Sequence, residues 1–197
     1  MQELRPLGAQ QKVWNIRWDE LTDKSVTSGD LVEPSLRVAS RNIKLQLRDL
    51  DLPATYDARI RDLEARRVAL EPHDVEGRRR IMEQHTQLTA ERGVAANLRP
   101  GGPHYIHPEI QAIRLGAGCA ILGLPGEFFV ETAQRIQAEA GIPHLLIACY
   151  ANHYIYYVVP AHEYAKGGYE AGATMLTEEA EDTVRSEAVT LLREVMS

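Results

Sequence analysis

One stretch of the sequence, residues 119–150, constrains the fold more than any other. Two apolar runs, 119–124 and 144–150, flank Glu127 and a helical pattern that ends at Gly141. A strand, a helix and a strand of this length form a right-handed crossover, which makes the two strands parallel. We therefore predict an α/β fold in which both strands end at the same edge of a mixed sheet.

The edge where these strands end is where we expect the functional site. Open α/β sheets place their ligand crevices there. Glu127 follows the first strand, and six tyrosines lie between residues 150 and 169, after the second. Glu127 taken alone is best interpreted as an acid that caps the next helix, because free amides at a helix N-terminus favour a carboxylate. The tyrosines fit either an aromatic packing cluster or a polar, partly dry pocket.

Three further patterns predict strands. Apolar residues alternate with polar ones at 43–47, which predicts a strand over 36–48 with one buried face. The runs 110–115 and 119–124 are joined by a turn that contains two glycines, which predicts a β-hairpin. The run at 144–150 is apolar on both faces of a strand, and we predict that it is buried.

Helical periodicity predicts a long helical hairpin and a C-terminal helix. The hairpin consists of helices over 53–70 and 74–93, with Asp74 as N-cap and Gly93 as C-cap. Its outer surface is charged, so we interpret it as a surface prop or as a contact for a homo-oligomer. The last helix begins near Thr177, carries acids in its first turns and buries an apolar stripe. That stripe consists of Val184, Ala188, Leu191 and Val195.

We interpret residues 1–197 as a single domain. Residues 1–35 form an irregular lead-in in which Val13, Trp14, Ile16 and Trp18 alternate like a short strand. Residues 36–94 hold the first strand and the helical hairpin, and residues 108–197 form the α/β part that carries the site.

The composition excludes several classes of function. A net charge of −6 gives no electrostatic reason to expect a nucleic acid partner. No run of about 18 apolar residues is present, so we predict no transmembrane segment. Residues 1–5 show no apolar segment typical of a secretory signal, and the compartment stays open. The two cysteines, Cys119 and Cys149, lie in apolar runs, and we predict two buried thiols.

Four short motifs, in order along the chain, resemble the neutral ceramidase family. They are Pro-Gly-Glu-Phe at 125–128, Asn-x-Tyr-x-x-Tyr at 152–157, Glu-Tyr at 163–164 and Tyr-Glu-Ala at 169–171. The resemblance covers residues 108–176 well and extends more loosely back to the strand near Leu36. It implies that the chain corresponds to the C-terminal half of a larger catalytic domain.

The resemblance also implies a zinc-dependent amide hydrolase and assigns roles to residues. Glu127 and Tyr157 fall on zinc ligands, and Tyr169 falls on the residue that steadies the oxyanion. We expect the pocket to be lined by Gly126, Asn152, His153 and Tyr154. The implied substrate is a small amide or lipid-like molecule. Carboxylate and phenolate oxygens are hard donors that suit Zn²⁺.

The chain departs from the family in two respects. Phe129-Val130 and Val158-Val159 stand where family members carry Thr-Thr. The family takes two histidine ligands and a catalytic serine from its N-terminal half, and residues 1–107 contain no matching motif. A catalytic zinc normally has three protein ligands, so this chain is catalytically incomplete unless an N-terminal half is supplied as a partner. His104 and His107 are interpreted as exposed loop residues.

Two rival interpretations remain open beside the hydrolase. One rival is a non-catalytic α/β module that uses the tyrosines or the charged hairpin for protein contacts. It also fits a metal-free hydrolase with Glu127 as general base, although such an enzyme needs a nucleophile that the sequence does not reveal.

Overall fold

The structure of the chain is a computed structural model that describes residues 35–71, 73–98 and 102–197. The strand-like alternation of Val13, Trp14, Ile16 and Trp18 lies outside the described residues. The helices are α2 (Pro53–Ala69), α3 (Val75–Asn97), α4 (Val130–Ala140), α5 (Ala161–Tyr164), α6 (Tyr169–Gly172) and α7 (Ala180–Met196). The strands are β1 (Arg37–Asn42), β2 (Leu45–Gln46), β3 (Tyr105–Ile106), β4 (Glu109–Gly116), β5 (Cys119–Gly123), β6 (Glu127–Phe128), β7 (His144–Ala148) and β8 (Tyr157–Val158).

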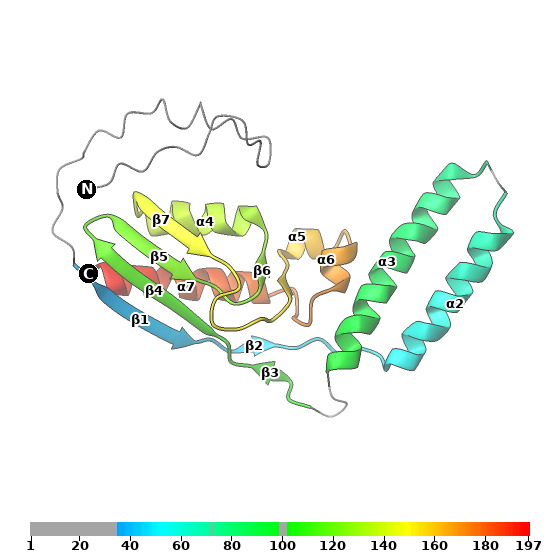
Figure 1. Cartoon of the computed structure of the whole chain (residues 1–197), viewed down its shortest axis with the longest axis horizontal. Helices are drawn as coiled ribbons and strands as arrows, with labels where there is room; N and C mark the ends of the chain where they lie inside the picture. The colour runs from blue at the N-terminus through cyan, green and yellow to red at the C-terminus, as the bar shows by residue number, and fades with distance from the viewer. Residues whose placement is uncertain (1–34, 72, 99–101) are drawn as a thin grey trace, which may run out of the picture. The chain divides into compact units, whose positions relative to one another are not determined.

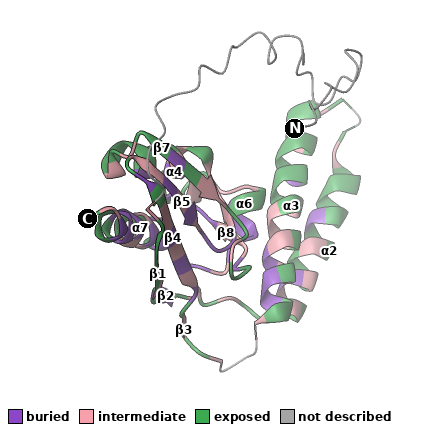
Figure 2. Ribbon diagram, turned by 60° about the vertical axis from the view of Figure 1, so that its left-hand side comes forward, coloured by how far each residue is buried: buried purple, intermediate pink, exposed green. Residues whose placement is uncertain are grey.

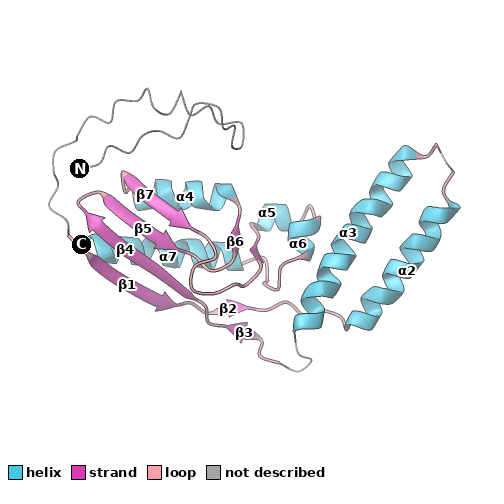
Figure 3. Cartoon of the chain, in the orientation of Figure 1, coloured by secondary structure: helices cyan, strands magenta, loops and turns pink. Residues whose placement is uncertain are grey.

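A four-stranded mixed sheet in the order β1-β4-β5-β7 forms the centre of the fold (Figures 1 and 3). β1 and β5 each pair antiparallel with β4, and β7 pairs parallel with β5 after the α4 crossover. This confirms the α/β class, the predicted hairpin and the predicted parallel pair. Gly118 closes the β4–β5 turn at φ 74°, a left-handed conformation that favours glycine.

One face of the sheet is covered by helices, and the main core lies between them. Ile110, Leu122 and the other inward residues of β4 and β5 pack against α7 and α4 in a single apolar cluster. The predicted stripe of α7 is buried throughout, and Val189 and Leu192 widen it. Figure 2 shows this buried layer beside the largely exposed α2 and α3.

The helical hairpin is confirmed, with one correction at its end. Asp74 caps α3 as predicted, and its Oδ1 accepts a hydrogen bond from the Gly77 amide at 2.8 Å. Gly93 is not the C-cap, because α3 continues through it to Asn97. Burial of Val94 and Ala95 stabilises the additional turn.

The predicted strand over 36–48 is divided into β1 and β2. β1 ends opposite Glu109, because the next residue of the partner strand is Pro108, which has no amide to donate. The chain then leaves the central sheet, and β2 pairs with β3. The predicted alternation of burial holds across this break, with Ile43 and Leu45 buried.

The prediction of a buried strand at 144–150 is wrong. β7 ends at Ala148 and is an edge strand; Leu145 points into the helix-covered core and is buried, whereas Leu146 points to the opposite face and is 62% exposed. The prediction of two buried thiols is also wrong. Cys149 follows this edge strand and is exposed, and Cys119 is only partly covered because it lies on the sheet face without helices.

Within the described residues, none of the helices combines the length and the apolar character that crossing a membrane requires. His104 and His107 are exposed, as predicted.

Candidate functional site

Glu127 and Tyr157 are direct neighbours, although they lie thirty positions apart in the sequence. They are register partners in the short parallel pair formed by β6 and β8. The Glu127 amide donates to the Tyr156 carbonyl at 2.9 Å. This bond fixes Glu127 beside residues 149–156, which we call the tyrosine loop. The Tyr157 carbonyl accepts a hydrogen bond from Thr174 Oγ1 at 2.6 Å. Hydrogen bonds to the backbone of this strand pair therefore position both predicted metal ligands.

Gly126 makes this close approach possible. Its φ is 82°, and a Cβ at this position would lie 2.4 Å from the Tyr156 carbonyl oxygen. No other residue fits a left-handed position with backbone so near. The Gly126 amide donates to the His153 carbonyl at 3.2 Å, so the Pro-Gly-Glu segment and the tyrosine loop hold each other.

The tyrosine loop itself is strained. Tyr150, Asn152 and Tyr156 have φ values of 58°, 65° and 61°, in the left-handed region that non-glycine residues rarely adopt. Three such residues within seven positions cost free energy, and strain of this kind concentrates at functional sites. The loop is also tied to α3, because Asn97 Nδ2 donates to the Tyr156 hydroxyl at 2.9 Å.

The Glu127 carboxylate is the hub of a group of phenols. The Tyr154 hydroxyl donates to Glu127 Oε1 at 3.0 Å, and the hydroxyls of Tyr157 and Tyr150 also interact with this carboxylate. The rings of Tyr150 and Tyr154 stack with a centroid separation of 5.7 Å and an interplanar angle of 4°. The stacked pair fixes two donors that face one acid.

These contacts shift the pKa values of all four groups. Partial burial raises the pKa of Glu127, but hydrogen bonds with Tyr157, Tyr150 and Tyr154 outweigh it and leave that pKa below its ordinary value. The hydrogen bond with Glu127 is the main cause that raises the pKa of Tyr157 and of Tyr150. Burial, followed by the bond with Glu127, raises the pKa of Tyr154 to about 12. At neutral pH the site therefore holds one carboxylate and protonated phenols.

Tyr169 lies at the same site on a separate element. It begins α6, its side chain is half-exposed, and its ring meets that of Tyr157 edge-on with centroids 6.0 Å apart. α6 is held against α3, where a Cβ on Gly172 would lie 2.7 Å from the Gln87 carbonyl oxygen. Tyr169 thus presents an accessible hydroxyl-bearing ring next to the Glu127–Tyr157 pair.

The remaining predicted residues differ in their placement. Gly126 and Tyr154 contribute to the site as described. The His153 side chain is exposed, and its Nδ1 accepts a hydrogen bond from the Glu109 amide at 3.4 Å, at the start of β4. Asn152 is exposed and serves the loop through its left-handed backbone. Sequence reasoning missed Tyr150 as a partner of Glu127, although its position at the end of the parallel strand was a usable signal.

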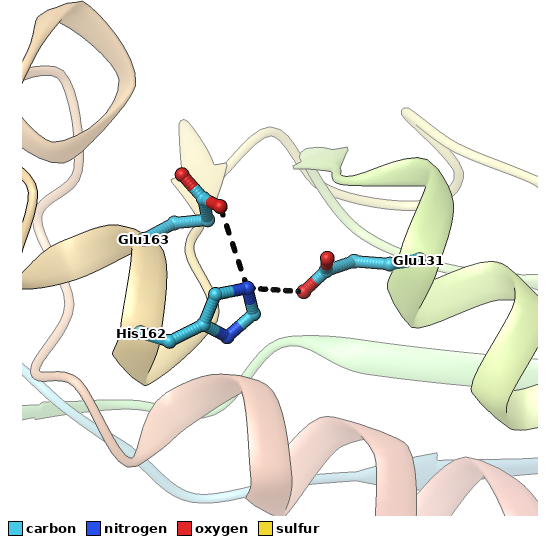
Figure 4. A group of neighbouring side chains, drawn as sticks. All are labelled: Glu131, His162 and Glu163. Carbon is cyan, nitrogen blue, oxygen red and sulfur yellow. Dashed lines mark ion pairs between the residues drawn. The ribbon is translucent and has the colours of Figure 1, made fainter.

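A second cluster of titratable side chains lies between α4 and α5 (Figure 4). His162 Nε2 lies 3.1 Å from Glu131 Oε1 and 3.4 Å from Glu163 Oε1. Among the described residues this is the group of three whose ligand-type atoms lie within 4.8 Å of one another. Both acids also have cationic partners: Lys166 binds Glu163 at 2.5 Å, and Arg135 lies 3.6 Å from Glu131. We interpret the cluster as an ion-pair network that joins the two helices.

The donor set at Glu127 fits a divalent metal in kind. The Glu127 carboxylate and the Tyr157 hydroxyl lie next to each other and interact. Both oxygens are hard donors that Zn²⁺ accepts. His104 and His107 are exposed, and His153 contacts β4. Glu127 and Tyr157 could therefore hold a metal as two ligands, one fewer than the three protein ligands that a catalytic zinc normally has.

The sequence of the chain was compared with those of known proteins. No model of a known protein family matches the chain. Neutral ceramidase from Pseudomonas aeruginosa is 34% identical over 103 residues, which cover 47% of this chain and 15% of that protein. The chain thus spans a small part of the curated relative that it matches.

Two solved structures are also similar. A ceramidase complexed with C2 has a TM-score of 0.40 at 32% sequence identity and covers 48% of this chain and 16% of that one. The neutral ceramidase from Pseudomonas aeruginosa has a TM-score of 0.48 at 21% identity, with 82% and 28% covered. Over about half of its length, the chain is therefore similar in sequence to a part of neutral ceramidase.

Proposed function

We propose that the chain supplies one part of a zinc-dependent amide hydrolase of the neutral ceramidase type. The observation that carries the proposal is the direct pairing of Glu127 with Tyr157, which brings a carboxylate and a phenol together from separate sequence motifs. The proposed substrate is an N-acyl amide or a similar lipid-like molecule.

Each side chain of the site has a role in this proposal. Glu127 and Tyr157 would hold the zinc, which when bound supplies a Lewis acid that polarises an amide carbonyl and activates water. Tyr150 and Tyr154 orient the Glu127 carboxylate through their hydroxyls. Tyr169 offers its hydroxyl as a hydrogen-bond donor to the oxyanion that forms when an amide is attacked. Its half-exposed ring leaves that hydroxyl accessible to a substrate.

The proposal requires a partner. Two protein ligands are too few for a catalytic zinc, so the remaining ligands and the nucleophile must come from another part of the domain. The chain covers 15% of the length of its relative, which is consistent with a missing portion. A homo-oligomer through the α2–α3 hairpin stays a prediction, supported by the exposed Val68 and Met82.

Metal binding tests the proposal directly. We expect the chain, combined with the remainder of its domain, to bind zinc with a stoichiometry of one by elemental analysis. Glu127→Gln should abolish this binding, because it removes a charged oxygen ligand and keeps the size of the side chain. Glu131→Gln is the matched control, since it changes an acid of the ion-pair network in Figure 4.

Three outcomes would contradict the proposal. Unchanged zinc content in the Glu127→Gln protein would remove Glu127 as a ligand. Zinc loss in Glu131→Gln alone would move the metal to the ion-pair network. A protein that binds no zinc in any form would favour the rival interpretation, a non-catalytic α/β binding module.

A further inference from the structure

Among the residues that the structure describes, helices cover one face of the central sheet and leave the other face open. Residues alternate along each strand, and Ile110, Ala112, Ala120, Leu122 and Leu145 point into the helix-covered core. The residues between them point to the opposite side. We call this side the open face; its members are Val38, Ser40, Asn42, Glu109, Gln111, Ile113, Cys119, Ile121, Gly123, His144, Leu146 and Ala148.

The open face carries a continuous apolar row across all four strands. The register pairs Val38 with Ile113, Ile113 with Ile121 and Ile121 with Leu146. At a strand spacing of about 4.8 Å the row extends over about 14 Å. Its two ends are the most exposed members, with Val38 at 57% and Leu146 at 62%. Large apolar side chains thus reach solvent on both edge strands.

A strand with one solvated face normally has its charged residues on that face, whereas β1 has Arg41 on the helix side. On the helix side Arg41 forms ion pairs of 2.6 Å with both Glu187 and Glu194 of α7. On the open side stand Val38 and Ser40, and Glu109, at the start of β4, is the one Lys, Arg, Asp or Glu among the members of the open face. A sheet that faces water normally carries polar residues there, and native edge strands carry charges that prevent association. Strands with apolar residues on both faces are typical of sheets that are covered on both sides.

The open face is continuous with the candidate site. β5 and β7 lead directly into Glu127 and the tyrosine loop. A Cβ on Gly123 would lie 3.0 Å from Ala151 Cβ, so the loop crosses the end of the open face. A polypeptide that covers this face lies beside the edge where the Glu127–Tyr157 pair still needs ligands.

We propose that the open face is the docking surface for the remainder of the ceramidase-like domain, which covers it with an uncharged apolar layer. This inference rests on the proposed function, since it names the surface through which the missing part joins the site. The relative is far longer than this chain, and its additional length is enough to supply such a layer. A second copy of the chain would bury the row equally well, but it would contribute none of the portion that this chain lacks.

Photo-crosslinking tests the docking surface in the cells that produce the protein. A photoreactive amino acid replaces Leu146 on the open face and, as control, Val68 on α2, which is 81% exposed. We expect position 146 to crosslink to a polypeptide segment, in the same or another chain, whose sequence aligns with neutral ceramidase outside the part that this chain covers. Position 68 should crosslink to that segment with at most a tenth of the yield, and a crosslink from position 68 to a second copy would report on the hairpin contact instead.

A second experiment places a charge in the apolar row of the open face. Val38→Lys should lower the yield at position 146 by about tenfold or more, because an unpaired charge in an apolar contact disfavours binding. Val38 is exposed, so this change leaves the fold intact, and Val75→Lys on α3 is the control. Crosslinks to a second copy, to an unrelated protein or to nothing would overturn the inference. Zinc binding reports on the proposed function separately: a correct crosslink without zinc refutes the metal site alone.

Discussion

The central sheet and the tyrosine loop are adjacent, yet they are held together by different forces. The sheet with α4 and α7 is stabilised by burial of regular apolar stripes, and Leu122, Val184 and Leu192 are fully buried. The loop over 149–156 is mostly exposed, adopts three left-handed non-glycine conformations and depends on hydrogen bonds to Gly126 and Glu127. Apolar burial stabilises the sheet and its helices as a scaffold. The scaffold supports the strained tyrosine loop, and the loop positions the polar groups around Glu127.

The largest expected effect is on the scaffold. Leu122→Ala should lower the free energy of unfolding by about 3 kcal/mol, because it removes apolar contacts and leaves a cavity in the core. Leu146→Ala on the open face is the matched control and should cost less than about 0.5 kcal/mol in the isolated chain. Chemical denaturation measures both. Similar losses for the two leucines would show that the open face is already buried.

A change at Gly126 should break the loop rather than the scaffold. Gly126→Ala should cost about 2 kcal/mol or more, because it forces a Cβ against the Tyr156 carbonyl oxygen at a left-handed φ. Hydrogen exchange should show lost protection at the Glu127 and Tyr150 amides, while the amides of β4 and β5 keep theirs. Uniform loss over the sheet would mean that the loop and the scaffold unfold as one unit.

The two regions also differ in how far the sequence predicted them. The β4–β5 hairpin, the α4 crossover and α7 follow from periodicity and glycine positions, because local patterns encode burial and turns. The left-handed Tyr150, Asn152 and Tyr156 do not, since nothing local favours them and the surrounding structure imposes them. The site pair was reached through motif resemblance, and its hydrogen-bonded geometry came only from the structure.

Errors in the sheet have a related cause. Leu145 and Leu146 are both apolar, and periodicity cannot tell which side of a strand another part of the molecule covers. The expectation of a buried strand assumed that both sides were covered within this chain. If the remainder of the domain covers the open face, that expectation describes the whole domain better than it describes the part.

The electrostatics of the site provide a third test. In metal-free protein, Glu127→Gln should lower the pKa values of Tyr150, Tyr154 and Tyr157 toward the ordinary value of about 10, because the negative acceptor is lost. Absorbance of the phenolate during a pH titration measures this. Tyr164, whose pKa is raised to about 12 mainly by burial, is the internal control and should not move.

The same shifts give stability a defined pH dependence. Because the folded state holds the phenol protons more tightly than the unfolded chain, this stabilisation is complete below about pH 10. It is lost as pH rises through the folded pKa, which is about 12 for Tyr154. Glu127→Gln should weaken this dependence. An unchanged alkaline profile in that variant would show that the carboxylate does not hold the phenols in solution.

The smallest effect is expected at Gly93, in the helix that supports the loop. Gly93 lies within α3, and a Cβ there meets nothing within 4 Å. Gly93→Ala should therefore raise the free energy of unfolding by about 0.5–1 kcal/mol, since alanine favours helix and restricts the unfolded chain. Thermal or chemical unfolding measures the gain. Destabilisation would instead support a helix end at Gly93, and it would disconnect Asn97 from Tyr156. A stabilised α3 with unchanged zinc binding would show that the hairpin supports the site without setting its geometry.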